Sequence, residues 1–514
     1  MKAYHILIIL WGFLPVTAMK PAAPLQKEPL QPNIIVFLID DMGWMDSSVP
    51  FGDSSYPLNK QFHTPNMERL AREGMLFSRA YTQPVCTPSR SCLLTGVHPA
   101  RSHITNWVNT QYNIPTDHPD SLLQTPAWNL NGLSPVETPK AFTAPLLPQI
   151  LQKAGYHTIH VGKAHWGSQG TAGADPLNMG FVTQVAGSSI GHPQSFYGKE
   201  NFGNMPGSTT AWAVDGLQEF HGKDMYLTEA LTLKTLQLLA YPIEQKKPFF
   251  LNLAHYAVHT PIQADKALVK RYHAAGLDST EAAYASMVEG MDRSLGRIMD
   301  FLTEKKIAEN TVILFLSDNG GLSAAGRGGR RHMHNLPLRS GKGSVYEGGI
   351  RIPLIVKWPG HTREGSRTKT PVAMEDIFPT LLEMAKASSV TPVSKVDGAS
   401  LVPILEGKQV EQQSKKILIH YPHRWTTIEE EGIAWTSGLI KDNWKIVYLM
   451  KKKKLELYDL ESDQGEQQDL SAAQPEQLKK MAWLLTETLR SYDAQMPSWK
   501  ENGQPVEWPH ALIK

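Results

Sequence analysis

Cysteine is scarce in this sequence: Cys86 and Cys92 are the only two among 514 residues, which excludes a disulfide-rich scaffold. A single disulfide between Cys86 and Cys92 is the less favoured alternative. An excess of charge is also missing, because 51 Lys+Arg face 49 Asp+Glu and leave a formal net charge of +2. Nucleic-acid-binding proteins usually carry a basic excess, so we expect no nucleic-acid partner. The one marked charge run, Lys451–Lys454, is interpreted as a solvated turn between two strands.

No apolar run reaches the length of about 20 residues that spans a membrane. The short run Ile6–Leu14 follows the positively charged Lys2 and precedes the small residues Val16-Thr17-Ala18. This pattern is typical of a secretory signal peptide, here predicted over residues 1–18. Neither cysteine lies near the cleavage site, so we expect no lipid anchor. The sequence therefore predicts an exported protein, periplasmic or secreted, without stable membrane insertion.

What the chain does contain is a series of short apolar runs, each followed directly by polar residues. Asn33–Ile39 ends at Asp40 and Asp41, and Thr311–Leu316 ends at Ser317-Asp318-Asn319. Unbroken hydrophobicity is typical of strands buried on both faces of a parallel sheet. Such strands alternating with helices predict a doubly wound α/β fold whose ligands bind at the carboxyl ends of the strands. Two further predicted strands are Thr158–Val161 and Phe249–Leu253. The predicted helices are Met67–Glu73, Pro145–Ala154, Met225–Ala240 and Glu281–Glu304.

The last quarter of the chain has a different pattern. After a polar, irregular stretch around residues 386–400 come three short apolar segments and then a helical pattern over Glu476–Arg490. The segments are Lys416–His420, Trp444–Met450 and Leu455–Leu460. This order predicts a smaller C-terminal α+β subdomain over residues 400–514, with an antiparallel sheet and a terminal helix. The catalytic domain is predicted over residues 30–390.

Acidic and amide side chains follow two of the predicted strands. Asp40, Asp41, Asp318 and Asn319 offer only oxygen ligands, which suit a hard divalent cation such as Ca²⁺ or Mg²⁺. A single Asp-Asp pair after a strand is more often a helix cap or a solvated loop. Two such clusters at equivalent strand ends favour a metal site instead.

The segment Cys86-Thr87-Pro88-Ser89-Arg90-Ser91-Cys92-Leu93-Leu94-Thr95-Gly96 carries a more specific signal. It resembles the maturation signature C-x-P-S-R, followed by an apolar pair and T-G, of the formylglycine-dependent sulfatases in the alkaline phosphatase-like superfamily. Further ordered segments resemble motifs of that family and extend the likeness over most of the chain. They are residues 33–43, 63–66, 162–165, 257–261, 317–320, 338–342 and 347–353.

The resemblance implies a fold and a mechanism. The fold would be a large mixed sheet flanked by helices. A maturation enzyme would oxidise Cys86 to formylglycine, an aldehyde whose hydrated form has two hydroxyl groups. One hydroxyl would attack the sulfur of a sulfate ester, and deprotonation of the other would then expel sulfate and restore the aldehyde.

Roles for individual residues also follow from the resemblance. Arg90 and Lys163 would stabilise the hydrated aldehyde, and His165 would act as the base of the second step. His259 would donate a proton to the leaving oxygen, and Lys342 would bind sulfate oxygens. The metal, Ca²⁺ or alternatively Mg²⁺, would be held by Asp40, Asp41, Asp318, Asn319 and the modified Cys86. Two departures from the family pattern are Ala164, usually Trp, and Val258, usually Pro.

The substrate is less specified by the sequence. A sulfated carbohydrate attacked from its end is the favoured class, with His192, Gln194 and His334 as candidate binding residues. The segment Arg330-Arg331-His332-Met333-His334 is a candidate contact for an anionic or polyhydroxylated substrate. Trp425 and Trp444 are candidates for stacking on a sugar ring, although core packing is the default for tryptophan. Two alternatives stay open: a phosphoryl or phosphonate monoester hydrolase on the same fold, and a glycan-binding protein with a decayed site.

Overall fold

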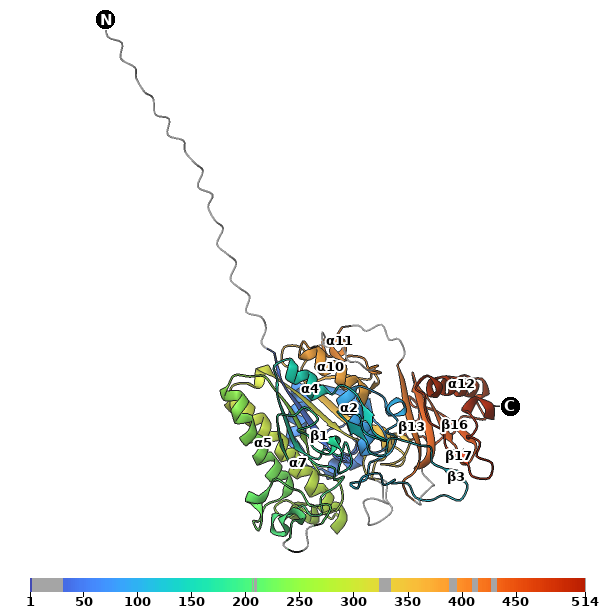
Figure 1. Ribbon diagram of the computed structural model, residues 1–514, viewed down its shortest axis with the longest axis horizontal. Helices are drawn as coiled ribbons and strands as arrows, with labels where there is room; N and C mark the ends of the chain where they lie inside the picture. The colour runs from blue at the N-terminus through green and yellow to red at the C-terminus, as the bar shows by residue number, and fades with distance from the viewer. Residues whose placement is uncertain are drawn as a thin grey trace. The chain divides into compact units, whose positions relative to one another are not determined.

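The predicted parallel strands form the centre of the computed structural model (Figure 1). The structure describes Met1 and residues 31–205, 207, 210–322, 334–387, 395–408, 415–426 and 432–513. The expected signal peptide, apart from Met1, lies outside these residues. None of the helices among the described residues is long and apolar enough to cross a membrane.

The main sheet is nine-stranded and mixed. Its order is β11-β2-β10-β9-β1-β8-β6-β7, with β12 also paired to β2. The five strands from β9 to β7 run parallel, whereas β10 runs antiparallel to both of its neighbours. The strands are β1 (Asn33–Ile39), β2 (Met75–Tyr81), β6 (His157–Gly162), β7 (Thr183–Val185), β8 (Phe249–Ala254), β9 (Thr311–Ser317), β10 (Arg351–Lys357), β11 (Ser366–Thr368) and β12 (Val372–Ala373).

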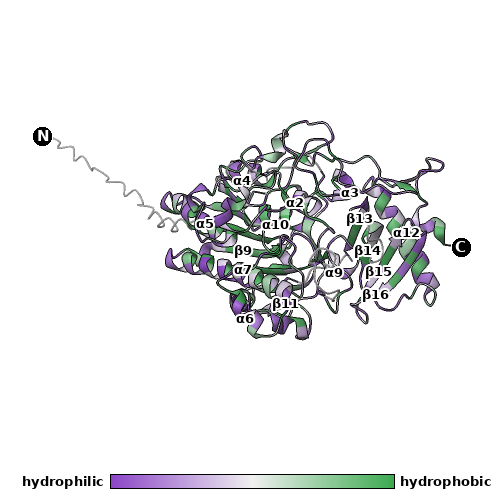
Figure 2. Ribbon diagram, turned by 90° about the horizontal axis from the view of Figure 1, so that it is seen from below, coloured by the Kyte–Doolittle hydropathy of each residue, from purple (hydrophilic) through white to green (hydrophobic). Residues whose placement is uncertain are grey.

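Helices cover both faces of this sheet (Figures 1 and 2). Alternate residues of β1 enter different cores: Ile35 and Phe37 pack in the core that includes α1, α5 and α7, whereas Val36 and Leu38 pack in the core that includes α2, α4 and α10. A strand buried on both faces therefore reads as an unbroken apolar run. The helices are α1 (Pro65–Glu73), α2 (Cys86–Thr95), α3 (Pro99–Ser102), α4 (Leu147–Lys153), α5 (Leu227–Glu244), α6 (Val269–Ala274), α7 (Ser279–Glu304), α9 (Glu347–Ile350), α10 (Ile377–Met384) and α11 (Val402–Leu405).

A second sheet follows in the C-terminal part of the chain. Its four antiparallel strands, in the order β13-β14-β15-β16, pack against the long terminal helix α12 (Pro475–Ser491). The Lys451–Lys454 run lies at the turn between β15 and β16, as predicted, and Lys451 pairs there with Asp120. The strands are β13 (Lys416–Arg424), β14 (Ala434–Lys441), β15 (Trp444–Leu449) and β16 (Lys454–Asp459). Two-stranded pairings join β3 (Leu123–Gln124) to β17 (Ser498–Trp499) and β4 (Leu133–Ser134) to β5 (Phe142–Thr143).

The α/β class and the antiparallel C-terminal sheet with its helix are confirmed. The sequence interpretation missed β2, β10, β14 and the helix α2. Charged residues interrupt the apolar pattern of β2 (MLFSRAY) and β10 (RIPLIVK), and a proline interrupts that of β10 as well. The alternative of a Cys86–Cys92 disulfide does not hold, since both cysteines are free and buried.

A buried ionic cluster joins the C-terminal sheet to the catalytic part of the chain. Lys445 of β15, whose side chain is fully buried, lies 2.9 Å from Glu347 Oε1 and 2.7 Å from Glu466 Oε1. Glu347 begins α9 and also accepts a hydrogen bond from the Tyr81 hydroxyl. Arg351 pairs with Glu347 and donates to the Ser78 carbonyl. Each charge in the cluster is therefore compensated within the protein interior.

We predict that Lys445→Met lowers the free energy of unfolding by about 3–5 kcal/mol, because it leaves two buried carboxylates without their shared cation. Lys454→Met is the matched control, since the Lys454 side chain is half exposed and pairs with Glu456 and Asp469. That change should cost less than about 1 kcal/mol. Urea denaturation followed by circular dichroism measures both, and equal losses would contradict the importance of the buried cluster.

Candidate active site

The acidic residues meet where neighbouring parallel strands end. Ile39 at the end of β1 pairs in register with Ser317 at the end of β9, which brings Asp40 and Asp41 beside Asp318. The Asp41 backbone N–H donates to Asp318 Oδ1 at 3.2 Å. All of these carboxylates are fully buried. The doubly wound topology thus places the acids at one edge of the sheet, as the sequence predicts.

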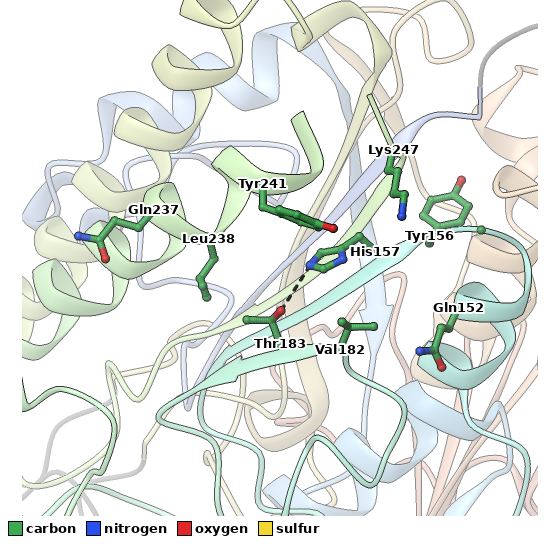
Figure 3. Close-up of a pocket in the computed structure, with 10 residues that line it drawn as sticks. Gln152, Tyr156, His157, Val182, Thr183, Gln237, Leu238, Tyr241 and Lys247 are labelled. Carbon is green, nitrogen blue, oxygen red and sulfur yellow. Dashed lines mark hydrogen bonds between the residues drawn. The ribbon is translucent and has the colours of Figure 1, made fainter. Parts of the chain in front are cut away.

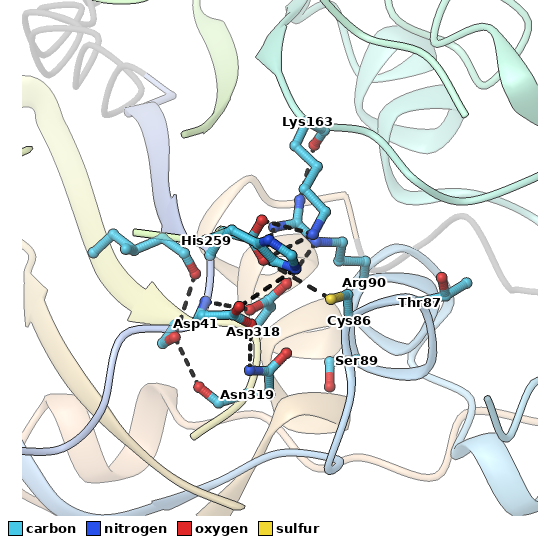
Figure 4. Close-up of polar contacts among 12 residues, drawn as sticks. Asp41, Cys86, Thr87, Ser89, Arg90, Lys163, His259, Asp318 and Asn319 are labelled. Carbon is cyan, nitrogen blue, oxygen red and sulfur yellow. Dashed lines mark hydrogen bonds and ion pairs between the residues drawn. The ribbon is translucent and has the colours of Figure 1, made fainter. Parts of the chain in front are cut away.

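Cys86 is the first residue of α2 and joins this cluster from a different element (Figure 4). Its Sγ lies 3.9 Å from Asp40 Oδ1. Ligand atoms of Cys86, Asp40, Asp41 and His259 all lie within 4.8 Å of one another. The N-terminus of a helix carries a partial positive charge, so this position favours a negatively charged group.

Burial changes what the Cys86 thiol can do. Removal from water raises the pKa of Cys86 to about 11, although Lys163 and Lys342 oppose the shift. At neutral pH the unmodified side chain is then a neutral thiol, which is a weak nucleophile. Cys92, two turns further along α2, faces a different partner and has its Sγ 3.9 Å from Glu375 Oε2.

Three buried cations balance the three buried carboxylates. Arg90 Nε donates to Asp318 Oδ2 at 2.7 Å, and its Nη1 donates to the Lys163 carbonyl at 2.8 Å. Lys163 Nζ lies 2.8 and 2.7 Å from the two oxygens of Asp40. Lys342 Nζ lies 2.6 Å from Asp41 Oδ1 and 2.8 Å from Oδ2. Three positive charges therefore lie around Cys86, and the three carboxylates neutralise them.

The residues fit a hard divalent cation. Asn319 Nδ2 donates to Asp41 Oδ1 at 2.8 Å, whereas Asn319 Oδ1 is buried and has no hydrogen-bond partner among the described residues. An acceptor in that state costs free energy unless a donor or a cation satisfies it. Burial raises the pKa of Asp40 well above its usual value, against the opposing charge of Lys163. A cation at the carboxylates would remove that cost, and oxygen-only ligands suit Ca²⁺ or Mg²⁺.

His165 is held in one tautomer. Its Nε2 lies 2.9 Å from the Val108 carbonyl, which can only accept a hydrogen bond, so the proton resides on Nε2. Its Nδ1 is buried and has no hydrogen-bond partner among the described residues. Burial, helped by the nearby Lys163 charge, lowers the pKa of His165 well below its usual value. Nδ1 is therefore a free proton acceptor.

His259 follows β8 and lies on the more open side of the cluster, with its side chain 13% exposed. Its Nδ1 lies 3.0 Å from the Thr260 carbonyl, and its Nε2 lies 3.4 Å from Asp41 Oδ2. The remaining ring nitrogen, Nε2, is thus the one that points toward the acidic cluster. Burial, together with Lys342 and Lys163, lowers the pKa of His259 well below its usual value.

The three candidate substrate residues occupy different surroundings. His192 lies beside the site, because its ring stacks on His259 with centroids 5.6 Å apart. Gln194 has an exposed side chain, and its backbone N–H donates to the Trp212 carbonyl. His334 is buried with Nδ1 3.5 Å from Glu281 Oε1 of α7.

The tryptophans of the C-terminal part also differ. The Trp425 ring lies 5.9 Å from Lys342 Nζ, next to the site. Trp444, by contrast, packs against the core between the C-terminal sheet and α12. The basic segment Arg330-Arg331-His332 lies outside the described residues.

Two contributors to the site had no signal in the sequence. The Val108 carbonyl, which fixes the tautomer of His165, belongs to a loop that contains none of the motifs. Trp212 stacks on His192 with ring centroids 4.3 Å apart. A backbone carbonyl has no sequence signature, and a lone tryptophan is read as core by default, so only the folded chain reveals either one.

A separate cavity of about 630 Å³ lies at the opposite ends of β6 and β7 (Figure 3). His157, the first residue of β6, and Thr183, the first of β7, line it together with Tyr241. Its lining contains neither a carboxylate nor a thiol. The catalytic groups of the candidate site are at the other end of these strands, so this cavity is not part of it.

Comparison with known proteins gives consistent matches. A family model described as "Sulfatase" matches residues 32–387, and one described as "N-sulphoglucosamine sulphohydrolase, C-terminal" matches residues 341–495. A sulfatase of Formosa agariphila is 28% identical, over 98% of this chain and 96% of its own length. The human N-acetylgalactosamine-6-sulfatase is 30% identical, over 91% of this chain and 87% of its own. The crystal structure of Ps i-CgsB in complex with k-i-k-neocarrahexaose has a TM-score of 0.70 at 25% identity, covering 91% of this chain and 95% of that one.

We predict that Ca²⁺ raises the thermal unfolding midpoint of the wild-type protein and that a chelator reverses the effect. A ligand that binds only the folded state stabilises it by about 2.7 kcal/mol at 100 times its Kd. Asp318→Ala should abolish the response, because it removes one of the buried carboxylates. Asp53→Ala, at an exposed carboxylate paired with Lys369, is the control and should keep it. A Ca²⁺ response that survives in Asp318→Ala, measured by differential scanning fluorimetry, would refute this metal site.

Proposed function

Because the chain belongs to the sulfatase family, whose members are sulfuric ester hydrolases, we propose that it removes sulfate from a carbohydrate, acting at the end of a sulfated glycan or oligosaccharide. The observation that carries this proposal is the position of Cys86. It begins α2 at 3.9 Å from Asp40, within a cluster of three buried carboxylates and three buried cations. A divalent cation held at these carboxylates would give the balanced cluster an excess of positive charge, which favours an anionic substrate such as a sulfate ester.

Support for a carbohydrate substrate comes from the relatives. N-acetylgalactosamine-6-sulfatase is named for a sugar sulfate, and Ps i-CgsB is seen with an oligosaccharide of six units bound. Both align with more than nine-tenths of this chain. A sugar substrate also suits a site with a proton donor, since a sugar alkoxide leaves poorly unless it is protonated.

The nucleophile would be made from Cys86 by a formylglycine-generating maturation enzyme. Formylglycine would supply, in its hydrated form, one hydroxyl to attack sulfur and a second whose deprotonation releases sulfate. The high pKa of the unmodified thiol supports this assignment, because burial makes the thiol itself ineffective. Arg90 and Lys163 would hold the modified side chain in place, since both reach the carboxylates beside it.

His165 and His259 would divide the proton transfers between them. His165 Nδ1 is a free acceptor in a fixed tautomer, so we assign it the proton of the second step. The Thr260 hydroxyl, 3.0 Å from His259 Nδ1, would donate to that nitrogen, so that the proton of the neutral ring would reside on Nε2. His259 would then donate from Nε2 to the leaving oxygen, because this nitrogen points into the cluster from the more open side. Lys342 would bind sulfate oxygens as a point charge.

Asp40, Asp41, Asp318 and Asn319, with the modified Cys86, would hold Ca²⁺ or alternatively Mg²⁺. The ion would offset negative charge on the sulfate and on the nucleophile. The buried and unpartnered Asn319 Oδ1 supports this set of ligands.

Recognition of the sugar would fall to residues around the opening. His192 is the best supported of the three candidates, because it touches His259. Gln194 and His334 would contribute less to sugar binding. The Gln194 side chain is exposed, and His334 pairs with Glu281. We propose that residues 30–390 form the catalytic domain, that residues 400–514 form a subdomain contributing Trp425 beside Lys342, and that the protein acts after export to the periplasm or the medium.

We predict that protein whose Cys86 peptide carries the aldehyde by mass releases sulfate from one or more members of a panel of sulfated mono- and oligosaccharides. Cys86→Ala should lose this activity entirely. Cys92→Ala is the matched control on the same helix, because its thiol is buried beside Glu375, and it should retain activity. Silence across the panel with the aldehyde present would count against a small sulfated sugar as substrate.

We further predict that His259→Ala slows hydrolysis of sugar sulfates about 100-fold more than that of 4-nitrophenyl sulfate, since nitrophenolate leaves without a proton. His273→Ala, an exposed histidine of α6, provides the comparison and should affect neither substrate. The measurement is the ratio of variant to wild-type kcat for each of the two substrates. Equal losses on both substrates would remove His259 from the role of acid.

A further inference from the structure

Three aromatic rings are aligned beside the candidate active site. The His192 ring stacks on Trp212 with centroids 4.3 Å apart and an angle of 17° between the planes. The same His192 ring stacks with His259, at 5.6 Å and 12°. His192 therefore links Trp212 to His259 through a nearly parallel series of ring faces.

The backbone around this stack is fixed on both sides. The Gln194 N–H donates to the Trp212 carbonyl at 2.8 Å, which ties the segment of Trp212 to that of His192. One residue before His192, Gly191 lies so close to His165 that a Cβ would come within 2.8 Å of the imidazole Cε1. The His165 N–H in turn donates to the Ser188 carbonyl at 3.0 Å. The loop carrying His192 thus runs in contact with both histidines of the site.

The contacts of His259 divide between its edge and its face. The Thr260 carbonyl lies 3.0 Å from Nδ1 and Asp41 Oδ2 lies 3.4 Å from Nε2, so both contacts are made at the edge of the ring. A ring held only at its edge can still tilt about the line through those contacts. Stacking on His192 opposes that tilt, and Trp212 in turn backs His192.

We propose that Trp212 is a positioning residue, which holds the His259 imidazole through His192 so that Nε2 points at the leaving oxygen of the sulfate ester. This inference rests on the proposed sulfatase function and on the acid role of His259. A proton donor works only within hydrogen-bond reach and in line with the atom that it protonates, so loss of orientation reduces kcat. His192, whose Nδ1 lies 3.1 Å from the Pro193 carbonyl and whose ring stacks on Trp212, would then transmit this contact to His259 in addition to its proposed contact with the sugar.

Aryl sulfates test this without a sugar, because their two leaving groups differ in their need for a proton. Trp212→Leu should lower kcat for phenyl sulfate about 10-fold more than kcat for 4-nitrophenyl sulfate, with KM for both little changed. Trp212→Phe keeps a flat ring and should recover most of the loss. Trp483→Leu removes a tryptophan that lies on His510 in the C-terminal part, at 4.1 Å between centroids, and serves as the matched control.

A double-mutant comparison separates positioning from general damage. In the His259→Ala background, Trp212→Leu should cause no further selective loss on phenyl sulfate, since the two residues act through one proton transfer. Thermal midpoints of all variants show whether each is folded, and His192→Leu replaces Trp212→Leu if the latter does not fold.

The outcomes are distinct. Equal kcat losses on both esters, a change confined to KM, or additive losses in the double variant would each overturn the positioning role while leaving the sulfatase assignment in place. A wild-type protein that carries the aldehyde and hydrolyses neither ester would instead overturn the proposed function itself, and the inference with it.

Discussion

The structure around Cys86 depends on the mutual compensation of buried charge. Asp40, Asp41 and Asp318 sit at strand ends with no access to water, and an isolated carboxylate there would take up a proton or destabilise the fold. Arg90, Lys163 and Lys342 reach them from α2, from the end of β6 and from the segment before α9. Each of these elements is therefore held in place by the charge that its side chain satisfies.

The same arrangement preorganises the site for binding a sulfate group. The cations already surround the position of Cys86, so a sulfate group entering the site meets charges that need little reorganisation. Burial suppresses ionisation of the thiol, leaves His165 neutral with Nδ1 free, and leaves one oxygen of Asn319 without a donor. These features fit a modified nucleophile, a base and a metal ion respectively. The buried pairing of Lys445 with Glu347 extends this principle to the C-terminal sheet, because α9 follows the segment of Lys342.

Much of the fold could be predicted from the sequence, and the reasons are physical. The apolar runs Asn33–Ile39 and Thr311–Leu316 match β1 and β9 to within one residue, because strands covered on both faces must be apolar throughout. Strand β10 was not predicted, because its charged first residue, Arg351, belongs to a motif and interrupts the apolar pattern of the strand. The residues of the motifs do come together, because the topology of parallel strands requires their carboxyl ends to meet.

The parts that could not be predicted are contacts rather than elements. The tautomer of His165 depends on the Val108 carbonyl, and the orientation of His259 depends on ring faces from loops more than 40 residues away in sequence. His334, a candidate substrate residue close to Lys342 in the sequence, lies 3.5 Å through Nδ1 from Glu281 Oε1 of α7. Loops that approach a site from different strands leave no periodic pattern, so sequence spacing does not reveal which of their side chains meet.

The central claim is that catalysis depends on the modified residue 86 within this cluster of charges. The most direct test is kcat/KM for 4-nitrophenyl sulfate, measured on preparations whose fraction of aldehyde at Cys86, determined by mass spectrometry, is varied by withholding or supplying the maturation enzyme. We expect kcat/KM to rise in proportion to that fraction and to fall to zero when every Cys86 is a thiol. Undiminished turnover by the fully unmodified protein would contradict it.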